Sequence, residues 1–330
     1  MPRCFRPGRW ALGAAVLHRS ASGEAPRGES LRAQFRRDGF VPCAGVIDAA
    51  DAEALRLEFD RLFRGDFDTN VYPDEWHWRE GISRPDAFRE IVNGWKSSDV
   101  VARVVMRPGI ARLAAEVMGW AAGARLAQDD CLWKPPGAGG VAYHQDAPYI
   151  SHNFTPREDN SITVWIALDD ADEETGVVEY AVGSHAWRCA ETPLAAAQFH
   201  SADGEAAMRR AAADAGVADV EIQRLRVPCG GAVLHHQDCW HGSRENRSPA
   251  RPRRALGLHY VRADAALRTE PPPDYIYGRY ALGPGDATVH DEFFPVTWSP
   301  SGPSDVVKRR LGETGPSPPG EAAPSASALR

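Results

Sequence analysis

The sequence predicts a mainly β fold with flanking helices, of the double-stranded β-helix type that is also called a jelly roll. Two observations favour this fold class. From about residue 125 onward, short apolar or alternating runs are separated by glycine, proline, asparagine and aspartate, which is typical of a β-sandwich. Before that point, apolar residues recur at helical spacing. The 330 residues exceed an average domain, but β-rich folds often reach this length as one unit with helical additions.

Helices are expected in the first part of the chain, where they would pack outside the β core. Asp48 can cap the first of them, and Leu55, Phe59 and Leu62 then recur at a spacing that places them on one helix face. The third helix follows Pro108. The predicted helices cover residues 49–64, 99–107 and 109–118.

Strands are predicted in the second part of the chain, where turn residues bound each apolar run. An alanine-rich stretch over residues 186–220 interrupts them. We predict a helical insertion there, which could carry lid or substrate contacts. The predicted strands cover residues 126–133, 161–168, 176–181, 221–227, 232–235 and 254–261.

One folded domain is predicted over residues 31–312, with a helical part at 31–124 and a jelly-roll core at 125–300. Residues 1–30 carry four arginines before any acidic residue, together with a short apolar run. They form either a targeting segment or a disordered basic extension. Residues 313–330 are rich in proline, serine, alanine and glycine, which predicts a disordered tail.

The composition excludes several classes of protein. The formal net charge of −7 gives no basic surface for nucleic acid. No apolar run approaches the ~18 residues that span a bilayer, so no membrane span is predicted. The six cysteines contain no Cys-x-x-Cys pair, which argues against a zinc ribbon or disulfide scaffold and for a reducing compartment. We therefore predict a cytoplasmic monomer or homodimer acting on a small molecule. The location would be mitochondrial or another organelle if residues 1–30 are a targeting segment.

His144 and Asp146 form a His-x-Asp pair that predicts a metal site. In an extended segment, residues i and i+2 point to the same side, so both side chains can reach one ion. A mononuclear non-haem Fe(II) site needs two imidazoles and one carboxylate on one face of the metal, with the other positions left open. This pair would supply one imidazole and the carboxylate.

His241 is the expected third ligand. It follows an apolar, strand-like run over residues 231–236 and precedes a predicted turn at residues 242–243. His235 and His236 are its rivals, because they end the same apolar run. The three expected metal ligands are therefore His144, Asp146 and His241.

Around these residues the sequence resembles the phytanoyl-CoA dioxygenase family, a branch of the Fe(II)- and 2-oxoglutarate-dependent oxygenases. One departure is Val182, which stands where the family usually has proline before Gly-Ser-His. The resemblance implies the cupin-like jelly roll, and it implies Fe(II), 2-oxoglutarate and O2 as cofactor and co-substrates. It spans about residues 31–298 and rests on residues 35–41, 134–137, 144–149, 165–170, 183–185, 241–243, 253–256 and 293–296.

An arginine is expected to bind the distal carboxylate of 2-oxoglutarate, because its planar fork can make two charge-assisted hydrogen bonds. Arg253 matches the anchor of the resembled family, with Arg251 and Arg254 as rivals. Strand alternation favours Arg253, since an inward Arg254 would place leucines on its face. The resemblance also implies a hydroxyl donor at Ser243 and a tryptophan bordering the co-substrate at Trp165.

The predicted function is hydroxylation of an aliphatic carbon of a small-molecule or lipid-like substrate, in the manner of phytanoyl-CoA hydroxylase, with release of succinate and CO2. Tyr149 follows the His-x-Asp pair and is expected on the substrate side. No catalytic residue beyond the metal ligands is predicted. The alternatives are a radical halogenase, which Asp146 argues against, a cupin-like metalloenzyme without 2-oxoglutarate, which Arg253 argues against, and a non-catalytic ligand-binding relative.

Overall fold

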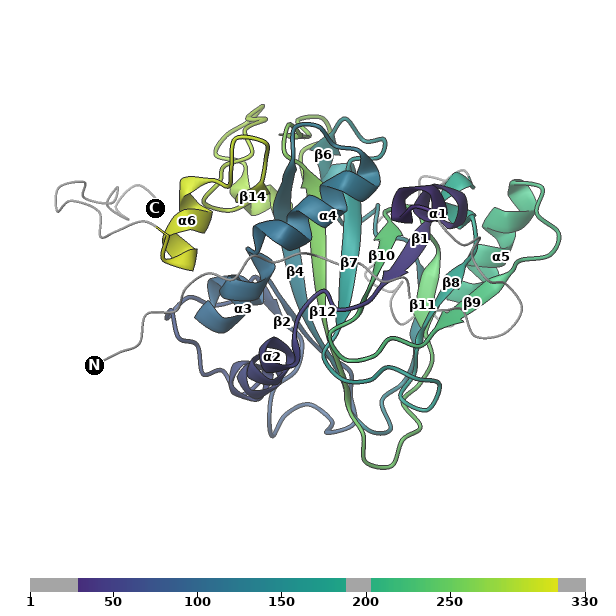
Figure 1. Cartoon of the computed structure of the whole chain (residues 1–330). Helices are drawn as coiled ribbons and strands as arrows, with labels where there is room; N and C mark the ends of the chain where they lie inside the picture. Colours follow the sequence, from purple (N-terminus) through teal and green to yellow (C-terminus); the bar gives the residue numbers. More distant parts are fainter. Residues whose placement is uncertain (1–28, 188–202, 314–330) are drawn as a thin grey trace, which may run out of the picture.

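A computed structural model describes residues 29–187 and 203–313, and its element labels are those of Figure 1. Nearly all of the predicted end segments 1–30 and 313–330 therefore lie outside the described residues, as do residues 188–202 of the predicted insertion. The described chain forms two antiparallel sheets that face each other, with helices outside them. The predicted fold class, mainly β with flanking helices, is confirmed.

The larger sheet has the strand order β1-β10-β7-β12-β4-β3-β2, and β14 pairs with β4 beyond this path. All of its pairs are antiparallel. Its eight strands are β1 (Phe40–Cys43), β2 (Glu75–Trp76), β3 (Arg89–Val92), β4 (Ala124–Lys134), β7 (Ser161–Ala167), β10 (Ala232–His236), β12 (Arg253–Arg262) and β14 (Val296–Trp298).

The smaller sheet has four strands in the order β5-β11-β8-β9, which are also antiparallel. A separate pair of short strands, β6 and β13, lies near one end. The bounds are β5 (Val141–His144), β8 (Val178–Ala181), β9 (Ile222–Leu225), β11 (His241–Ser243), β6 (Phe154–Thr155) and β13 (Ala266–Leu267).

Strand alternation sorts the larger sheet into two faces. On β7, Val164 and Ile166 pack into the core formed with the helices, whereas Trp165 and Ala167 pack toward the smaller sheet. β12 divides in the same way, because its even-numbered leucines enter the helix-side core and Ala255 enters the other. A residue's place in this two-residue period therefore decides whether it faces the helices or the space between the sheets.

The helices cover the outer faces of both sheets (Figure 1). Ser30 and Asp48 cap the first two with side-chain hydrogen bonds, and Gly39 ends the first in the left-handed conformation, with φ 84°. The longer helices are α1 (Leu31–Asp38), α2 (Ala49–Leu62), α3 (Asp99–Val105), α4 (Pro108–Met118), α5 (Gly204–Asp214) and α6 (Asp305–Leu311). The 3-10 helices are η1 (Gly94–Lys96), η2 (Ser151–Asn153), η3 (Ser184–Ala186) and η5 (Tyr277–Tyr280).

The structure departs from the sequence-based elements in four respects. The part predicted as helical, residues 31–124, also supplies β1, β2 and β3 to the larger sheet. The predicted strand at 221–227 is confined to β9, and the helix at 99–107 ends at Val105. The predicted turn at residues 242–243 is wrong, because these residues belong to β11, which is held between β5 and β8. Cross-strand pairing decides such short strands, and a single sequence does not reveal it.

The buried carboxyl group of Asp129 predicts a pH-dependent stability. Full burial raises the pKa of this group on β4 to about 8, although the Trp95 amide donates to it over 3.2 Å. The folded protein thus keeps a proton that the unfolded chain releases near pH 3.9. As the pH rises from the unfolded pKa to the folded pKa, the free energy of unfolding should fall by about 1.4 kcal/mol per pH unit. The stabilisation that the bound proton provides is fully present only below the unfolded pKa.

The side chain of Asp129→Asn cannot titrate. Between about pH 5 and about pH 7, the free energy of unfolding of the wild type should therefore fall relative to that of the variant by about 1.4 kcal/mol per pH unit, as measured by denaturant unfolding. Asp86→Asn is the matched control, because Asp86 is half-exposed and pairs with Arg84. Parallel pH profiles for the wild type and Asp129→Asn would contradict the prediction.

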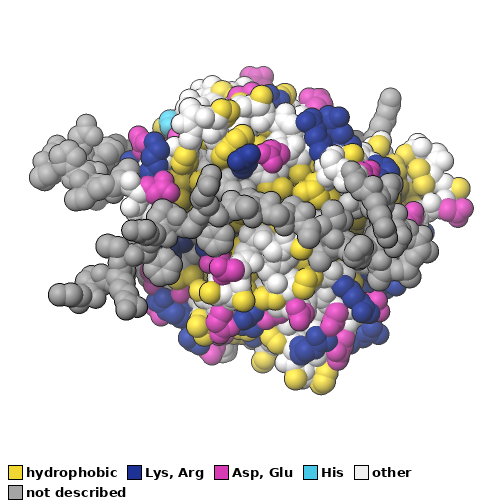
Figure 2. All heavy atoms as spheres, in the orientation of Figure 1, with side chains coloured by type: hydrophobic (Ala, Val, Ile, Leu, Met, Phe, Trp, Pro, Cys, Tyr) yellow, Lys and Arg dark blue, Asp and Glu magenta, His cyan; other side chains and the backbone are white. Residues whose placement is uncertain are grey.

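Basic and acidic side chains are interspersed over the face of the molecule that Figure 2 shows. No broad basic area is visible among the described residues of this face, in keeping with the net charge of −7. Within the described ranges, no helix combines the length and the apolar character needed to cross a membrane.

Candidate metal centre and cavity

Three buried side chains that can bind a metal converge between the two sheets. His144 ends β5, Asp146 lies in the bend that follows, and His241 begins β11 directly opposite His144. One ligand atom from each side chain lies within 4.8 Å of the others. The extended segment expected from the His-x-Asp spacing stops at His144, so Asp146 reaches the cluster from a bend rather than from a strand.

Hydrogen bonds to the two imidazoles fix which nitrogen can bind a metal. Nδ1 of His144 lies 2.8 Å from the Ala142 carbonyl oxygen, and Nδ1 of His241 lies 2.9 Å from that of Cys239. A carbonyl oxygen only accepts, so each Nδ1 carries the proton and each Nε2 carries the lone pair. The two Nε2 atoms lie 3.7 Å and 3.5 Å from Oδ1 of Asp146. Two neutral imidazoles and one carboxylate oxygen are the donors that suit Fe(II).

The other oxygen of Asp146 is held by the larger sheet. Oδ2 accepts a hydrogen bond from the Thr163 hydroxyl at 2.5 Å and another from Nε2 of His235 at 3.0 Å. These donors turn Oδ1 toward the two imidazoles. His235, a rival for the third ligand in the sequence, therefore contacts the carboxylate and orients it. Such partners of ligating groups tune metal affinity.

A further histidine extends this network. The single hydroxyl proton of Thr163 goes to Asp146, so Nδ1 of His259, 2.9 Å away, must donate to Thr163. Nε2 of His259 lies 2.7 Å from Asp130, which makes His259 a donor at both nitrogens. Burial opposes this charge, but Asp130 and Asp146 hold the pKa of His259 above its usual value. The sequence analysis missed His259, although alternation from Arg253 along the same strand places it on the inner face.

The charge states of the cluster suit a metal. Burial lowers the pKa of His144 to about 3 and that of His241 to about 4, so both imidazoles are neutral at physiological pH. Burial also opposes ionisation of Asp146, yet His241 and His235 hold the pKa of this carboxyl well below its usual value. Neutral imidazoles and an ionised carboxylate are the forms that bind a divalent cation.

Arg253 is a buried cation without a carboxylate partner among the described residues. Only 2% of it is exposed. Its Nη1 donates to the Gly176 carbonyl oxygen at 2.6 Å, and its Cζ lies 5.3 Å from the centre of the Trp165 ring. Its Nε has no hydrogen-bond partner within the described structure. Burial lowers its pKa to about 10, which leaves it charged at neutral pH. A buried charge requires a partner, so this is the arrangement of an anion site.

Lys134 lies opposite Arg253 in the larger sheet, in the backbone pairing of β4 with β12, but does not line the cavity. It is fully buried, and its amino group donates to Ser243 Oγ at 2.8 Å and to the Arg244 carbonyl oxygen. Burial and the nearby guanidinium hold the pKa of Lys134 well below its usual value. Because Ser243 accepts from Lys134, its own proton is left to donate to an incoming carboxylate. In the sequence, Lys134 stood out only as the first residue of the family motif at 134–137.

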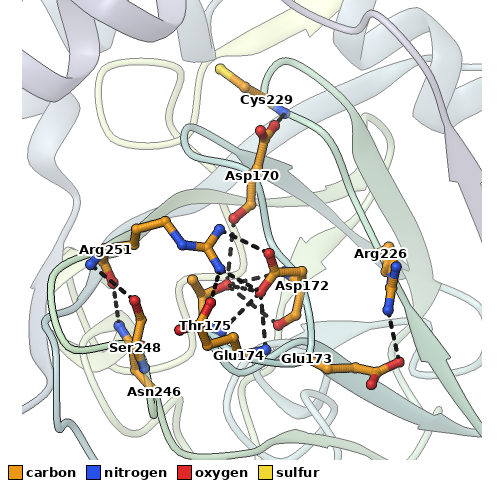
Figure 3. A network of polar contacts seen from close by, with 10 residues as sticks. All are labelled: Asp170, Asp172, Glu173, Glu174, Thr175, Arg226, Cys229, Asn246, Ser248 and Arg251. Carbon is orange, nitrogen blue, oxygen red and sulfur yellow. Dashed lines mark hydrogen bonds and ion pairs between the residues drawn. The ribbon is translucent and has the colours of Figure 1, made fainter.

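The arginines that rivalled Arg253 are engaged elsewhere. Arg254 forms a two-point ion pair with Asp169, at 2.8 Å and 2.9 Å. Arg251 is exposed and belongs to a surface network with Asp172 and Glu174 (Figure 3). Neither arginine lines the cavity.

His236, the other rival for the third metal ligand, also has a partner outside the cavity. Its Nε2 lies 2.9 Å from Asp159. It does not line the cavity, whereas His235 and His241 both do. Adjacent residues of a strand point to opposite faces, which separates His236 from His235.

One cavity of about 550 Å³ joins the metal-binding cluster to Arg253. Its volume is typical of small-molecule sites. The structure brings all of the predicted site residues to its wall, namely His144, Asp146, Tyr149, Trp165, His241, Ser243 and Arg253. The wall also contains His235, a rival for the third ligand, and five residues that the sequence did not single out, namely Glu75, Glu90, Asp130, Thr163 and His259.

A sequence model of the phytanoyl-CoA dioxygenase (PhyH) family matches residues 35–255. Among curated proteins, this chain is similar to a probable alpha-ketoglutarate-dependent hypophosphite dioxygenase of Stutzerimonas stutzeri, with 30% identity over 43% of this chain and 46% of the relative. It thus spans about half the length of that protein. It is also similar to L-proline trans-4-hydroxylase of Streptomyces griseoviridis, with 24% identity over 67% of this chain and 81% of the relative.

Solved structures share the fold. The epimerase SnoN of nogalamycin biosynthesis, described as non-heme and alpha-ketoglutarate-dependent, superposes with a TM-score of 0.61 at 23% identity, covering 81% of this chain and 96% of its own. EctD from S. alaskensis, with 2-oxoglutarate and 5-hydroxyectoine bound, gives 0.58 at 20% identity, covering 85% of this chain and 95% of its own.

Proposed function

Because this chain belongs to the phytanoyl-CoA dioxygenase family, we propose that it is an Fe(II)- and 2-oxoglutarate-dependent dioxygenase that hydroxylates an aliphatic carbon of a small molecule. One observation carries the proposal. A single cavity has the buried His-Asp-His cluster on one side and the buried, carboxylate-free Arg253 on the other. A ligand-binding relative without catalysis would need neither feature, and a metalloenzyme without 2-oxoglutarate would not need Arg253.

His144, Asp146 and His241 would hold the iron. The two Nε2 atoms and Oδ1 of Asp146 are the donor atoms, because the other nitrogens and the other carboxylate oxygen are engaged in hydrogen bonds. Three protein ligands leave the remaining positions for 2-oxoglutarate and O2. Thr163 and His235 keep the carboxylate oriented.

Arg253 would bind the distal carboxylate of 2-oxoglutarate, and Ser243 would donate a further hydrogen bond. The guanidinium is positioned by Gly176 and by the Trp165 ring, so it is held in place before the co-substrate arrives. Lys134 keeps the Ser243 hydroxyl oriented. A carboxylate that binds Arg253 loses its hydration water and gains charge-assisted hydrogen bonds to the guanidinium in a buried site.

Iron, 2-oxoglutarate and O2 supply the oxidative chemistry when bound, in which decarboxylation to succinate and CO2 is coupled to insertion of one oxygen atom into a C–H bond. The chain's own residues bind and orient the reactants and exclude water. No acid or base beyond the metal ligands is proposed. Tyr149, which lies 6.1 Å from Tyr275 between ring centres, would contact the substrate.

The substrate would be small. The relatives named above act on hypophosphite and on L-proline, and a cavity of about 550 Å³ suits molecules of modest size beside 2-oxoglutarate. A phytanoyl-CoA-like substrate would have to leave its CoA portion outside this cavity. A cytoplasmic location and a monomeric or homodimeric state are part of the same proposal.

The proposed function is tested without knowledge of the substrate. Anaerobic addition of Fe(II) and then 2-oxoglutarate should produce a visible charge-transfer band, and air should then release succinate slowly. Iron binding without a band would point to a metalloenzyme that does not use 2-oxoglutarate, and absence of both would point to a ligand-binding protein.

Once a substrate is found, hydroxylated product is expected even in high chloride. Halogenated product would contradict the role of Asp146, because a carboxylate ligand occupies the position that a halide needs.

A further inference from the structure

The cavity is electrically polarised. Arg253 lies at one end, and three carboxylates line the wall that β2, β3 and β4 form. These are Glu75, Glu90 and Asp130. Glu90 pairs with Leu132 on β4, and the side chain two residues along that strand on the same face is Asp130. The acidic side chains therefore share the inner face of the larger sheet.

Two of the three carboxylates already have hydrogen-bond partners within the protein. Asp130 accepts from Nε2 of His259 at 2.7 Å. Glu75 lies 2.7 Å from Nε2 of His77 and accepts from the Tyr275 hydroxyl at 3.0 Å. The bond to Glu75 also raises the pKa of His77.

Glu90 is the exception. Its side chain is partly buried and lines the cavity, and within the described structure its carboxylate makes no hydrogen bond or ion pair. Desolvation and the neighbouring Asp130 raise its pKa to about 8. Among the charged groups of the cavity wall, Asp146 belongs to the metal cluster and Arg253 to the anion site. Glu90 is therefore the carboxyl group of this wall that no described side chain engages in a hydrogen bond or ion pair.

A second metal ion does not account for Glu90. In the described chain, the only set of three or more ligand atoms that converge within 4.8 Å is that of His144, Asp146 and His241. The acidic wall is instead flanked by aromatic rings, because Tyr149 and Tyr275 meet edge to face beside it and both line the cavity. A carboxylate with aromatic rings close by is the surface that binds an organic cation, through an ion pair and through cation–π contacts.

We infer that the substrate of this enzyme carries a cationic nitrogen, a protonated amine or guanidinium, which pairs with Glu90 while the carbon to be hydroxylated faces His144, Asp146 and His241. This inference rests on the proposed function and names its substrate class. The pairing places a positive group at the acidic end of the cavity and leaves the cationic end to 2-oxoglutarate. It also fixes the orientation of a small substrate, since the charge must lie toward β3.

The experiment uses the anaerobic Fe(II) and 2-oxoglutarate complex of the full chain. Cyclohexylamine, piperidine and L-proline are titrated into it, each beside its N-acetyl derivative, which lacks the positive charge. Binding is followed as a shift of the charge-transfer band, and succinate release in air is measured for each probe. At least one amine should shift the band and stimulate succinate release, and its acetyl derivative should bind at least about 10-fold more weakly.

Glu90→Gln keeps the size of the side chain and removes its charge. It should weaken binding of that amine at least about 10-fold while leaving the affinity for 2-oxoglutarate unchanged. Glu116→Gln is the control, since Glu116 is exposed and pairs with Arg112. The inference is overturned if no amine shifts the band, if acetylated probes bind as well as amines, or if Glu90→Gln binds the amine like the wild type. Absence of the band itself would instead refute the proposed function.

Discussion

His144→Ala and His241→Ala are each expected to abolish stable iron binding and succinate formation. Each variant removes one of the three side chains that, in the described part of the chain, form the converging set of metal-binding atoms. Loss of a mere hydrogen-bond partner of a metal ligand typically costs about 10–100-fold in affinity or activity, so loss of a ligand should cost more than about 100-fold. Iron content after desalting and succinate release measure the two effects.

His236→Ala is the control for this pair, because His236 bonds to Asp159 and does not line the cavity. It should retain iron and turnover, provided that the variant folds, which circular dichroism would establish. Full turnover by His241→Ala together with an iron-free His236→Ala would move the third ligand to His236. Retention of iron by all three variants would refute the proposed metal site.

Arg253→Ala should raise the apparent requirement for 2-oxoglutarate steeply and leave iron binding nearly intact. Removing one member of a buried charge pair typically costs about 2–5 kcal/mol, which corresponds to at least about 30-fold in affinity. Arg253→Lys should recover little, because an ammonium cannot make the two parallel hydrogen bonds of a guanidinium. Titration of the charge-transfer band with 2-oxoglutarate gives the affinity directly.

Arg254→Ala is the matched control for Arg253, because the two residues are adjacent on β12 but face opposite sides. It removes the ion pair with Asp169 and should lower stability without changing the affinity for 2-oxoglutarate. If Arg254→Ala lost that affinity and Arg253→Ala kept it, the assignment of the anion site to Arg253 would be wrong.

The sequence predicted much of the fold because the relevant signals are local. Helices α2 and α4 follow from apolar spacing with a capping aspartate or a leading proline, and the long strands β4, β7 and β12 follow from apolar runs between turn residues. The family motifs named His144, Asp146, His241 and Arg253. The family anchor and strand alternation together favoured Arg253 over Arg254, and the structure has Arg253 lining the cavity and Arg254 outside it.

The short elements were beyond the sequence. β1, β3, β5 and β11 are each three or four residues long, and they exist because longer strands or other short strands pair with them. The residues at 242–243 looked like a turn because glycine and serine are turn residues, yet pairing with β8 and β5 extends them. The preference of glycine and serine for turns is small compared with the stabilisation that several cross-strand hydrogen bonds provide.

What the sequence by itself determined is the fold class and the identity of the residue types that can bind iron and an anion. Only the tertiary structure decided how neighbouring histidines divide their roles. His235 lies on the larger sheet and donates a hydrogen bond to Oδ2 of Asp146, while His241 lies on the smaller sheet beside His144. It also decided that Glu90, Asp130 and His259 share one wall, because the strand registers bring together side chains such as those of His259 and Asp130, which are 129 positions apart in the chain. Periodicity reveals which residues share a face of a strand, and the pairing of sheets determines what that face meets.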